Sequence, residues 1–440
     1  MHGGMAAAKG RRSCMAMDMD GLPEDVLHEV FSRVGNVKDL FMLAVTCRRW
    51  LRRFTDPAFL RGVVCPDQGQ GAAAGHHRAR LLGFFFQHQQ QARCGERTAM
   101  NKQQRTSPTF LPAPGSPLGP TLSCYDDDDG TFNYAEPLAA RRGIVLMRLV
   151  CRTFGARLFG LCNPITGERH VLPPLECSGI VSGYAIITVA DSSDDLDGPG
   201  RFAFSQLLVL TSLTDVHSYS AATRSWSGPI MCPDGARLLS LAGEKSAVVH
   251  QGAAHWLLID DHAAADNNLV LYKLSVDLQV GTVGRKAAVS LTKLPVRVGG
   301  SPLLCVSPDG KKLSVACVYL MHVTVWTPQQ DDDDAEAAAW LRTVIRIPVA
   351  VPNPNYPPRK QPKEKWFDFH RGSMLVVQRS SAISVLDLEK KVMEKIMEDC
   401  LPPRFSRMLD ETKSVAYEMD LVEFFLLHLG GLCGGLSLTE

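Results

Sequence analysis

The first strong hydrophobic pattern in the chain is an amphipathic stretch at residues 22–34, LPEDVLHEVFSRV. Pro23 suits the start of a helix, and the two acidic residues after it lie where the positive end of the helix dipole favours them. The apolar residues repeat at helical spacing and form one stripe, made of Leu27, Val30, Phe31 and Val34. The pattern therefore predicts a helix that buries one face and ends at Gly35.

A second helix is predicted to begin at Asn36, whose side chain can cap it, and to end at Asp56-Pro57. Phe41, Met42 and Val45 lie off its inward stripe, so this helix is apolar on two sides in its first half. About 40 residues rarely bury enough surface to fold alone. We therefore expect this helical block to pack on the rest of the chain or on a partner. The inward stripe consists of Leu40, Leu43, Ala44, Cys47, Trp50, Leu51 and Phe54.

From about residue 140 onward the pattern changes to short, β-branched apolar runs separated by Gly, Pro, Asn and Asp turns. A loose repeat appears in which a strand, a tight polar turn and another strand follow one another, 52 to 60 residues apart. A period near 55 suits four short strands and their loops, as in a propeller blade. Five units are visible, and the degenerate region 80–150 is expected to add a sixth. The first turn residues of the five units are Asn163, Ser220, Ser275, Thr327 and Asp387.

These patterns predict a small all-α module followed by a large all-β domain, a β-propeller of about six blades, with five or seven as open alternatives. The stretch 417–432 is expected to be a terminal helix packed on the propeller, or else its closing strand. The predicted organisation is a disordered leader at 1–20, a helical module at 21–62, a low-complexity linker at 63–135 with a possible strand at 80–87, and the β-propeller-like domain at 136–440.

Composition and charge say little about the partners of the protein. Lys and Arg number 47 and Asp and Glu 46, so no overall field favours nucleic acid or a membrane surface as a partner. No apolar run approaches the roughly 18–20 residues that span a bilayer, and the N-terminus lacks the apolar core of a secretory signal. The 13 Cys contain no Cys-x-x-Cys pair and are expected to be reduced, with Cys162, Cys305 and Cys317 as core residues. We therefore expect a cytoplasmic or nuclear protein.

Candidate chemistry is also sparse. The chain has no P-loop, no Gly-x-Ser-x-Gly elbow and no Gly-x-Gly-x-x-Gly. His28-Glu29 begins like a zinc motif, but Ser32 stands where the second His is needed. The acidic run at 125–136 has Tyr125 at the position of the first calcium ligand, where an oxygen ligand such as Asp is needed, so it is not interpreted as a calcium site. Trp226, Trp256, Trp326, Trp340 and Trp366 are interpreted as blade-core residues. No catalytic residue, metal or cofactor is predicted.

The string LPEDVLHEVFSRV, followed by VKDLFMLAVTCRRWLRRFTDPAFLRG, resembles an F-box. The matching features are the opening Leu22-Pro23, the spacing of Leu27 and Phe31, Asp39-Leu40, the Cys47-Arg48-x-Trp50 string and the trailing DPAFL. The turn GNV departs from the Pro that family members often have there. The resemblance implies that this block binds the Skp-type adaptor of a cullin–RING ubiquitin ligase. The residues expected at the adaptor are Leu22, Pro23, Leu27, Phe31, Leu40, Phe41, Val45, Cys47, Arg48 and Trp50.

The β-rich region resembles, more weakly, the F-box-associated β-propeller-like regions of plant F-box proteins, through CNPITGE (162–168) and GAAHWL (252–257). Together the two resemblances imply a non-catalytic substrate-recognition subunit of an SCF-type ubiquitin ligase, in which the propeller binds an unidentified target protein. Two alternatives stay open. One is a propeller enzyme that processes glycans and carries an unrelated helical leader. The other is a scaffold that binds the adaptor without promoting degradation.

Overall fold

The structure is a computed structural model of the whole chain, and only part of the chain is described below. The described residues are 23–64, 80–87, 108–113, 116, 118, 130–150, 156–177, 179–191, 204–243, 245–260, 269–278, 288–307, 309–319, 321–329, 339–347, 365–369, 373–377, 383–397 and 413–434. The predicted leader at 1–20, Leu22 and most of the predicted linker lie outside them.

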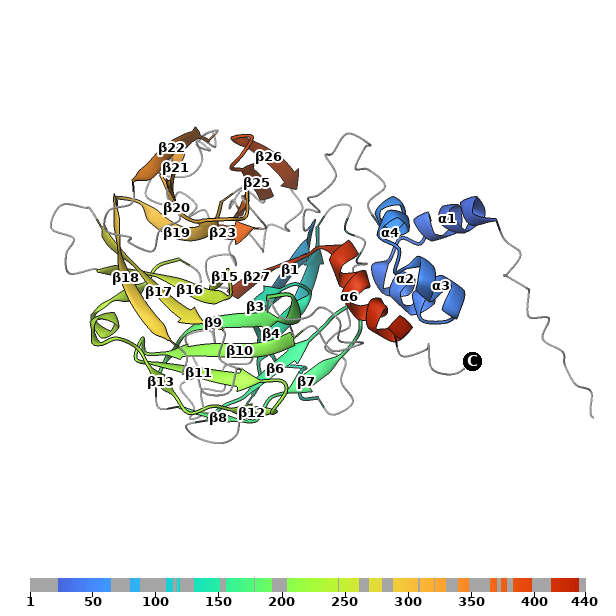
Figure 1. The fold of residues 1–440 in the computed structure, drawn as a ribbon, viewed down its shortest axis with the longest axis horizontal. Coiled ribbons are helices and arrows are strands. Elements are labelled where there is room, and N and C mark those ends of the chain that lie inside the picture. Colours follow the sequence, from blue (N-terminus) through green and yellow to red (C-terminus); the bar gives the residue numbers. More distant parts are fainter. Residues whose placement is uncertain are drawn as a thin grey trace, which may run out of the picture.

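Four short helices form the N-terminal block, where the sequence predicted two (Figure 1). They are α1 (Glu24–Ser32), α2 (Val37–Ala44), α3 (Arg48–Arg53) and α4 (Pro57–Val64). Asn36 caps α2, as predicted, because its side chain accepts a hydrogen bond of 3.0 Å from the Lys38 N–H.

The additional helices arise at Cys47, which interrupts the predicted second helix, and at Asp56-Pro57, where that helix was expected to end. Cys47 has an extended backbone, and its sulfur accepts a hydrogen bond of 3.4 Å from the Trp50 N–H, so the chain restarts there as α3. Asp56 accepts a hydrogen bond of 2.9 Å from the Ala58 N–H, and Pro57 takes the first position of α4. A proline is tolerated there because the first N–H groups of a helix have no partner within it. The Asp56-Pro57 pair therefore follows the end of α3, as predicted, and also begins α4, which the pattern did not predict.

The β-rich part forms a propeller arrangement of five antiparallel sheets, each of four or five strands (Figure 1). In chain order the sheets are β3 (Glu136–Arg141), β4 (Ile144–Arg148), β6 (Phe159–Cys162) and β7 (Arg169–Val171); β9 (Val181–Thr188), β10 (Phe204–Thr211), β11 (Asp215–Ser220), β12 (Ser225–Trp226) and β13 (Ile230–Met231); β14 (Ser240–Leu241), β15 (Val248–His250), β16 (Ala253–Asp260), β17 (Leu269–Asp277) and β18 (Val289–Val298); β19 (Ser301–Val306), β20 (Leu313–Val318), β21 (His322–Pro328) and β22 (Trp340–Arg346); and β23 (Lys365–Phe369), β24 (Ser373–Val377), β25 (Ile383–Asp387) and β26 (Val392–Met397). A small pair, β5 (Ala156–Arg157) with β8 (Leu175–Glu176), and the 3-10 turns η2 (Val189–Asp191) and η3 (Asp234–Leu238) complete this part.

A three-stranded sheet takes the place of a sixth full blade. It has the order β2-β1-β27 and pairs β1 (Arg80–Gln87) with β2 (Thr109–Pro112) on one side and with β27 (Lys413–Met419) on the other. The prediction of about six blades is therefore corrected to five full blades and this smaller sheet, within the described residues. The five turn residues of the sequence repeat all lie at or near the end of the third strand of a full blade.

The cores of the β-rich part lie between neighbouring sheets. One apolar cluster joins the first and second sheets, and others join the second to the third, the third to the fourth and the fourth to the fifth. Trp256 of β16 is 1% exposed, and its ring approaches β9 so closely that a Cβ at Gly183 would lie 2.5 Å from its Nε1. The predicted core cysteines Cys162, Cys305 and Cys317 are buried. Burying both faces of small sheets in this way makes each blade depend on its neighbours.

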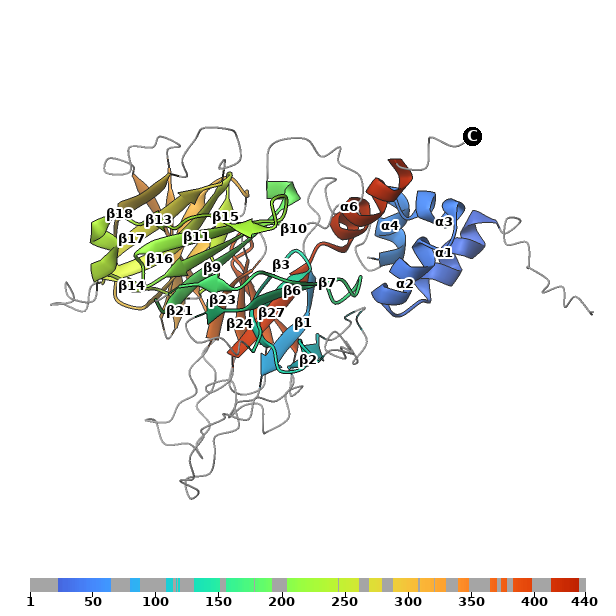
Figure 2. The ribbon, with the colours of Figure 1, turned by 90° about the horizontal axis from the view of Figure 1, so that it is seen from below.

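The last helix, α6 (Leu421–Gly434), follows β27 directly. The stretch 417–432 thus holds both alternatives that the sequence left open, since its first residues end the strand that pairs with β1 and the others form the terminal helix. The helix is apolar on most sides, which is typical of a helix covered on more than one face. Figures 1 and 2 both place α6 between the N-terminal helices and the sheets.

Candidate functional site

The N-terminal helices expose apolar side chains that the described part of the chain does not cover. On α1, Val26 is 42% and Val30 47% exposed, and on α2 and its C-cap Met42 is 51% and Val45 41% exposed. A concentration of large exposed apolar residues on so small a unit indicates a surface for another protein. These helices are therefore the candidate functional site.

An aromatic cluster beneath this surface holds the helices together. Phe31 of α1 is 2% exposed and meets Trp50 and Phe54 edge-on, with ring centroids 5.3 Å and 5.0 Å away. Edge-to-face pairs at these distances stabilise beyond the area that they bury. Leu27 and Leu40 are also buried here. Among the residues expected at an adaptor, these three apolar side chains therefore shape the module from inside.

The other residues expected at the adaptor are more accessible. Pro23, Val45, Cys47 and Arg48 are exposed, and Trp50 is half-buried with its ring against Phe31. The structure thus separates the predicted residues into an accessible group and a structural group, which the sequence alone did not do.

Three accessible apolar residues, Val26, Val30 and Met42, were not among the residues predicted to touch the adaptor. Val30 was assigned to the buried stripe of α1, but it lies 47% exposed. The signal that reveals it is a second apolar stripe in which Pro23, Val26 and Val30 follow at spacings of three and four. Met42 stood out only as an apolar residue outside the inward stripe of its helix.

Exposed positive charges also lie on the helical module. The short helix α3 carries four arginines, of which Arg48 and Arg52 are exposed. On α1 the exposed Arg33 pairs with Glu29 one turn earlier, and such a surface pair contributes little to stability. The candidate site therefore carries both exposed apolar side chains and exposed cationic ones.

Phe41, also expected at the adaptor, turns toward α6 instead of toward the exposed surface. Its ring centroid lies 5.7 Å from that of Phe424 and 6.0 Å from that of Phe425. His428 packs on the same group, 6.3 Å from the Phe41 ring, and its Nδ1–H donates a hydrogen bond of 2.9 Å to the Phe424 carbonyl. Burial lowers the pKa of His428, although this hydrogen bond opposes the shift. Part of the excess apolar surface of α2 is therefore covered within the same chain.

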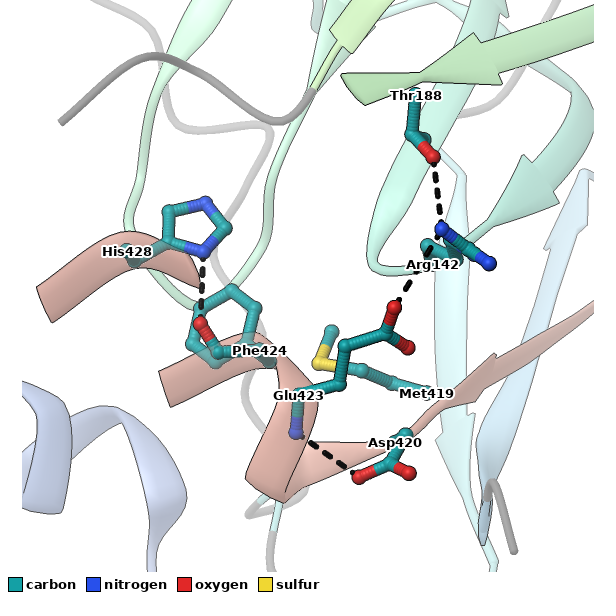
Figure 3. A pocket seen from close by; sticks show the side chains of 7 residues that line it. All are labelled: Arg142, Thr188, Met419, Asp420, Glu423, Phe424 and His428. Atoms are coloured by element: carbon teal, nitrogen blue, oxygen red, sulfur yellow. Dashed lines mark hydrogen bonds and ion pairs between the residues drawn. The ribbon is translucent and has the colours of Figure 1, made fainter. Parts of the chain in front are cut away.

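Figure 3 shows the ion pair that joins α6 to the sheets and the hydrogen bonds around it. Arg142, in the turn between β3 and β4, donates a hydrogen bond of 3.1 Å to the Thr188 hydroxyl, and its Nη1 lies 3.4 Å from the Glu423 Oε1. Asp420 caps the start of α6 by accepting a hydrogen bond of 3.0 Å from the Glu423 N–H. Arg142, Thr188, Asp420 and Glu423 are among the residues that line a small pocket beside the helix.

Neither a metal centre nor a membrane segment emerges from the part of the chain that the structure describes. In that part, no three His, Cys, Asp or Glu residues are grouped so that they could hold a metal ion. None of its helices combines the length and the apolar character that crossing a bilayer requires.

Comparison with known proteins gives two family matches. Residues 19–65 match the F-box-like model, and residues 104–357 match a model described as a domain of unknown function, DUF7595. The second match begins inside the segment that the sequence suggested was a linker. A search among curated proteins finds none that is similar.

Similar solved structures are distant. TolB from Acinetobacter baumannii is 12% identical, with a TM-score of 0.36, over 72% of this chain and 64% of that chain. KlAtg21, in its complex with the coiled coil of AgAtg16, is 13% identical, with a TM-score of 0.36, over 67% and 80%. The Nup133 β-propeller domain of Vanderwaltozyma polyspora is 13% identical, with a TM-score of 0.32, over 57% and 67%. The chain thus spans just under two thirds of the length of TolB.

Fold and matches together define a class: an F-box-like helical module followed by a mostly-β domain in a propeller arrangement, which is consistent with an F-box protein. Since the DUF7595 model matches more than half of the residues, the chain belongs to the DUF7595 family.

Proposed function

We propose that this protein is the substrate-recognition subunit of an SCF-type ubiquitin ligase. Its N-terminal helices bind a Skp-type adaptor and, through it, a cullin–RING ligase, while the β-domain binds a target protein. The observation that carries the proposal is the coincidence of the F-box-like match with the exposed apolar side chains of α1 and α2. An F-box-like module indicates an adaptor-type subunit rather than a catalytic one.

The contribution of such a subunit is proximity. A target held by the β-domain is kept near the ligase that the helices recruit, which raises the effective concentration of its lysines at the charged ubiquitin. No reaction at a residue of this chain is needed for this function.

The test is capture of a Skp-type adaptor and a cullin by the full chain. We expect Met42→Asp combined with Val45→Asp to weaken adaptor binding at least tenfold, because two charges then face an apolar partner surface. Met321→Asp is the matched control, since Met321 is 58% exposed in the β20–β21 connection. The control variant should bind the adaptor like the natural chain.

Two results would contradict the proposal in different ways. If the natural chain captures no adaptor, the ligase function is wrong. If the double variant captures as much adaptor as the natural chain, the interface lies elsewhere. A partner protein that is captured but not ubiquitinated by the assembled ligase would favour the non-degradative scaffold.

A further inference from the structure

The core of the N-terminal helices is continuous with that of the sheets. A single apolar cluster runs from α1–α4 through α6 to the three-stranded sheet and the first blade. Its fully buried members include Phe54 at the C-terminal end of α3, Phe425 of α6 and Tyr417 of β27. The helices and the sheets therefore share one core, and α6 is the element that joins them.

The contact between α6 and the helical module is aromatic and close. The rings of Phe54 and Phe425 stack with centroids 5.6 Å apart and planes 23° apart. The Phe41 ring contacts both Phe424 and Phe425, so α6 meets the end of α3 and the Phe41 side of α2 at once. A stack of this kind fixes an orientation as well as a distance.

The strand β27, which leads directly into α6, is anchored to the neighbouring strands. The Tyr417 hydroxyl donates a hydrogen bond of 3.2 Å to the Gly143 carbonyl, and the Tyr417 ring meets Phe85 of β1 at 5.3 Å. Arg142 and Glu423 add the ion pair described above. Every side chain of α6 described before Gly430 is buried or half-buried, which leaves the helix little surface for a further partner.

We infer that α6 is an integral part of the adaptor-binding module and positions it. By covering Phe41 and stacking on Phe54, α6 holds α2 and α3 in the arrangement that turns Met42 and Val45 outward. It also fixes the module on the β-domain. This inference rests on the proposed function, and it makes adaptor affinity depend on a helix that acts through α2 and α3.

Phe425→Ala tests the inference in the full chain. We expect adaptor affinity to fall at least tenfold and hydrogen exchange to rise in α2 and α3 more than in the sheets. The matched control is Phe159→Ala, because Phe159 is equally buried (0%) but packs between the first and second sheets. Phe159→Ala should keep adaptor affinity within twofold, although it removes as large a side chain from a core. Phe425→Leu, which retains most of the apolar volume, should restore binding.

The outcomes separate the inference from the proposed function. If the natural chain binds adaptor and Phe425→Ala binds equally well, the inference is overturned and the function stands. If the natural chain binds no adaptor, hydrogen exchange still decides, because unchanged exchange in α2 and α3 of Phe425→Ala would overturn the positioning role. If Phe425→Ala does not fold, Phe41→Ala, which removes the half-buried ring that α6 covers, is measured by hydrogen exchange at α2 and α3. Exchange equal to that of the natural chain would count against the inference.

Discussion

The helical module and a propeller blade solve the same problem in different ways. Each is too small to bury its apolar surface alone. The third sheet, built around β16, packs one face on the second sheet and the other on the fourth, so both faces are covered. The helical module packs one side on α6 and leaves Val26, Val30, Met42 and Val45 exposed. The uncovered side is therefore the feature that distinguishes the two regions.

Two tryptophans show this difference at the level of single residues. Trp256 is 1% exposed and also donates a hydrogen bond of 3.3 Å from its indole N–H to the Lys245 carbonyl. Trp50 is half-buried and packs edge-on against Phe31. A residue locked between two sheets should matter for folding, whereas a residue at the border of an open surface should matter for folding and for binding.

The largest effect is expected from Trp256→Ala. Removing this side chain leaves a cavity between the second and third sheets, and we expect a loss of about 3–5 kcal/mol in the free energy of unfolding. Chemical denaturation followed by far-UV circular dichroism measures it. A loss below about 1 kcal/mol would show that the two sheets do not depend on each other as this core implies.

Acid should weaken the β-domain through His255 of β16. Burial first, and then the positive charge of Lys273, lower the pKa of His255 to about 4 from its ordinary 6.5. The unfolded chain therefore binds a proton at this residue below about pH 6.5, which the folded chain does not bind until about pH 4. Stability falls as the pH drops through this window, by roughly 3 kcal/mol for the whole shift.

The matching measurement compares unfolding of the natural chain and of His255→Gln between pH 7 and pH 4. Glutamine retains a polar group toward Ser275, whose hydroxyl lies 2.8 Å from the His255 Nδ1. The natural chain should lose more stability than the variant over this range. Equal slopes would mean that His255 takes up its proton without opposing the fold.

The smallest effect on stability is expected from Trp50→Ala, about 1–2 kcal/mol, because the side chain is only half-buried and loses its edge-on contact with Phe31. We expect the β-domain to stay folded and adaptor capture to be lost. Circular dichroism and adaptor capture on the same sample measure both. Undiminished capture would show that Trp50 is not part of the binding surface and would leave Met42 and Val45 as the residues to test there.

Local patterns in the sequence were sufficient for much of this description. The periodicity of α1 and the cap at Asn36 predicted the first helix and the start of the second. The repeated turns marked the third strand of each full blade, because a tight polar turn is specified by a few adjacent residues. Where a local signal was ambiguous the prediction fell short. Cys47 is a weak cap compared with Ser or Asp, so the break between α2 and α3 was not recognised.

The sequence by itself determined the order of the two regions, the class of each and the helical block in which the candidate site lies. Only the tertiary structure decided that β27 pairs with β1, that α6 covers Phe41, and that Val30 is exposed while Phe31 is buried. The physical reason is that periodicity records the faces of one element, whereas covering a face requires a second element. Here that element is α6, which is far from α2 in the sequence, so the spacing of residues within α2 cannot predict the contact.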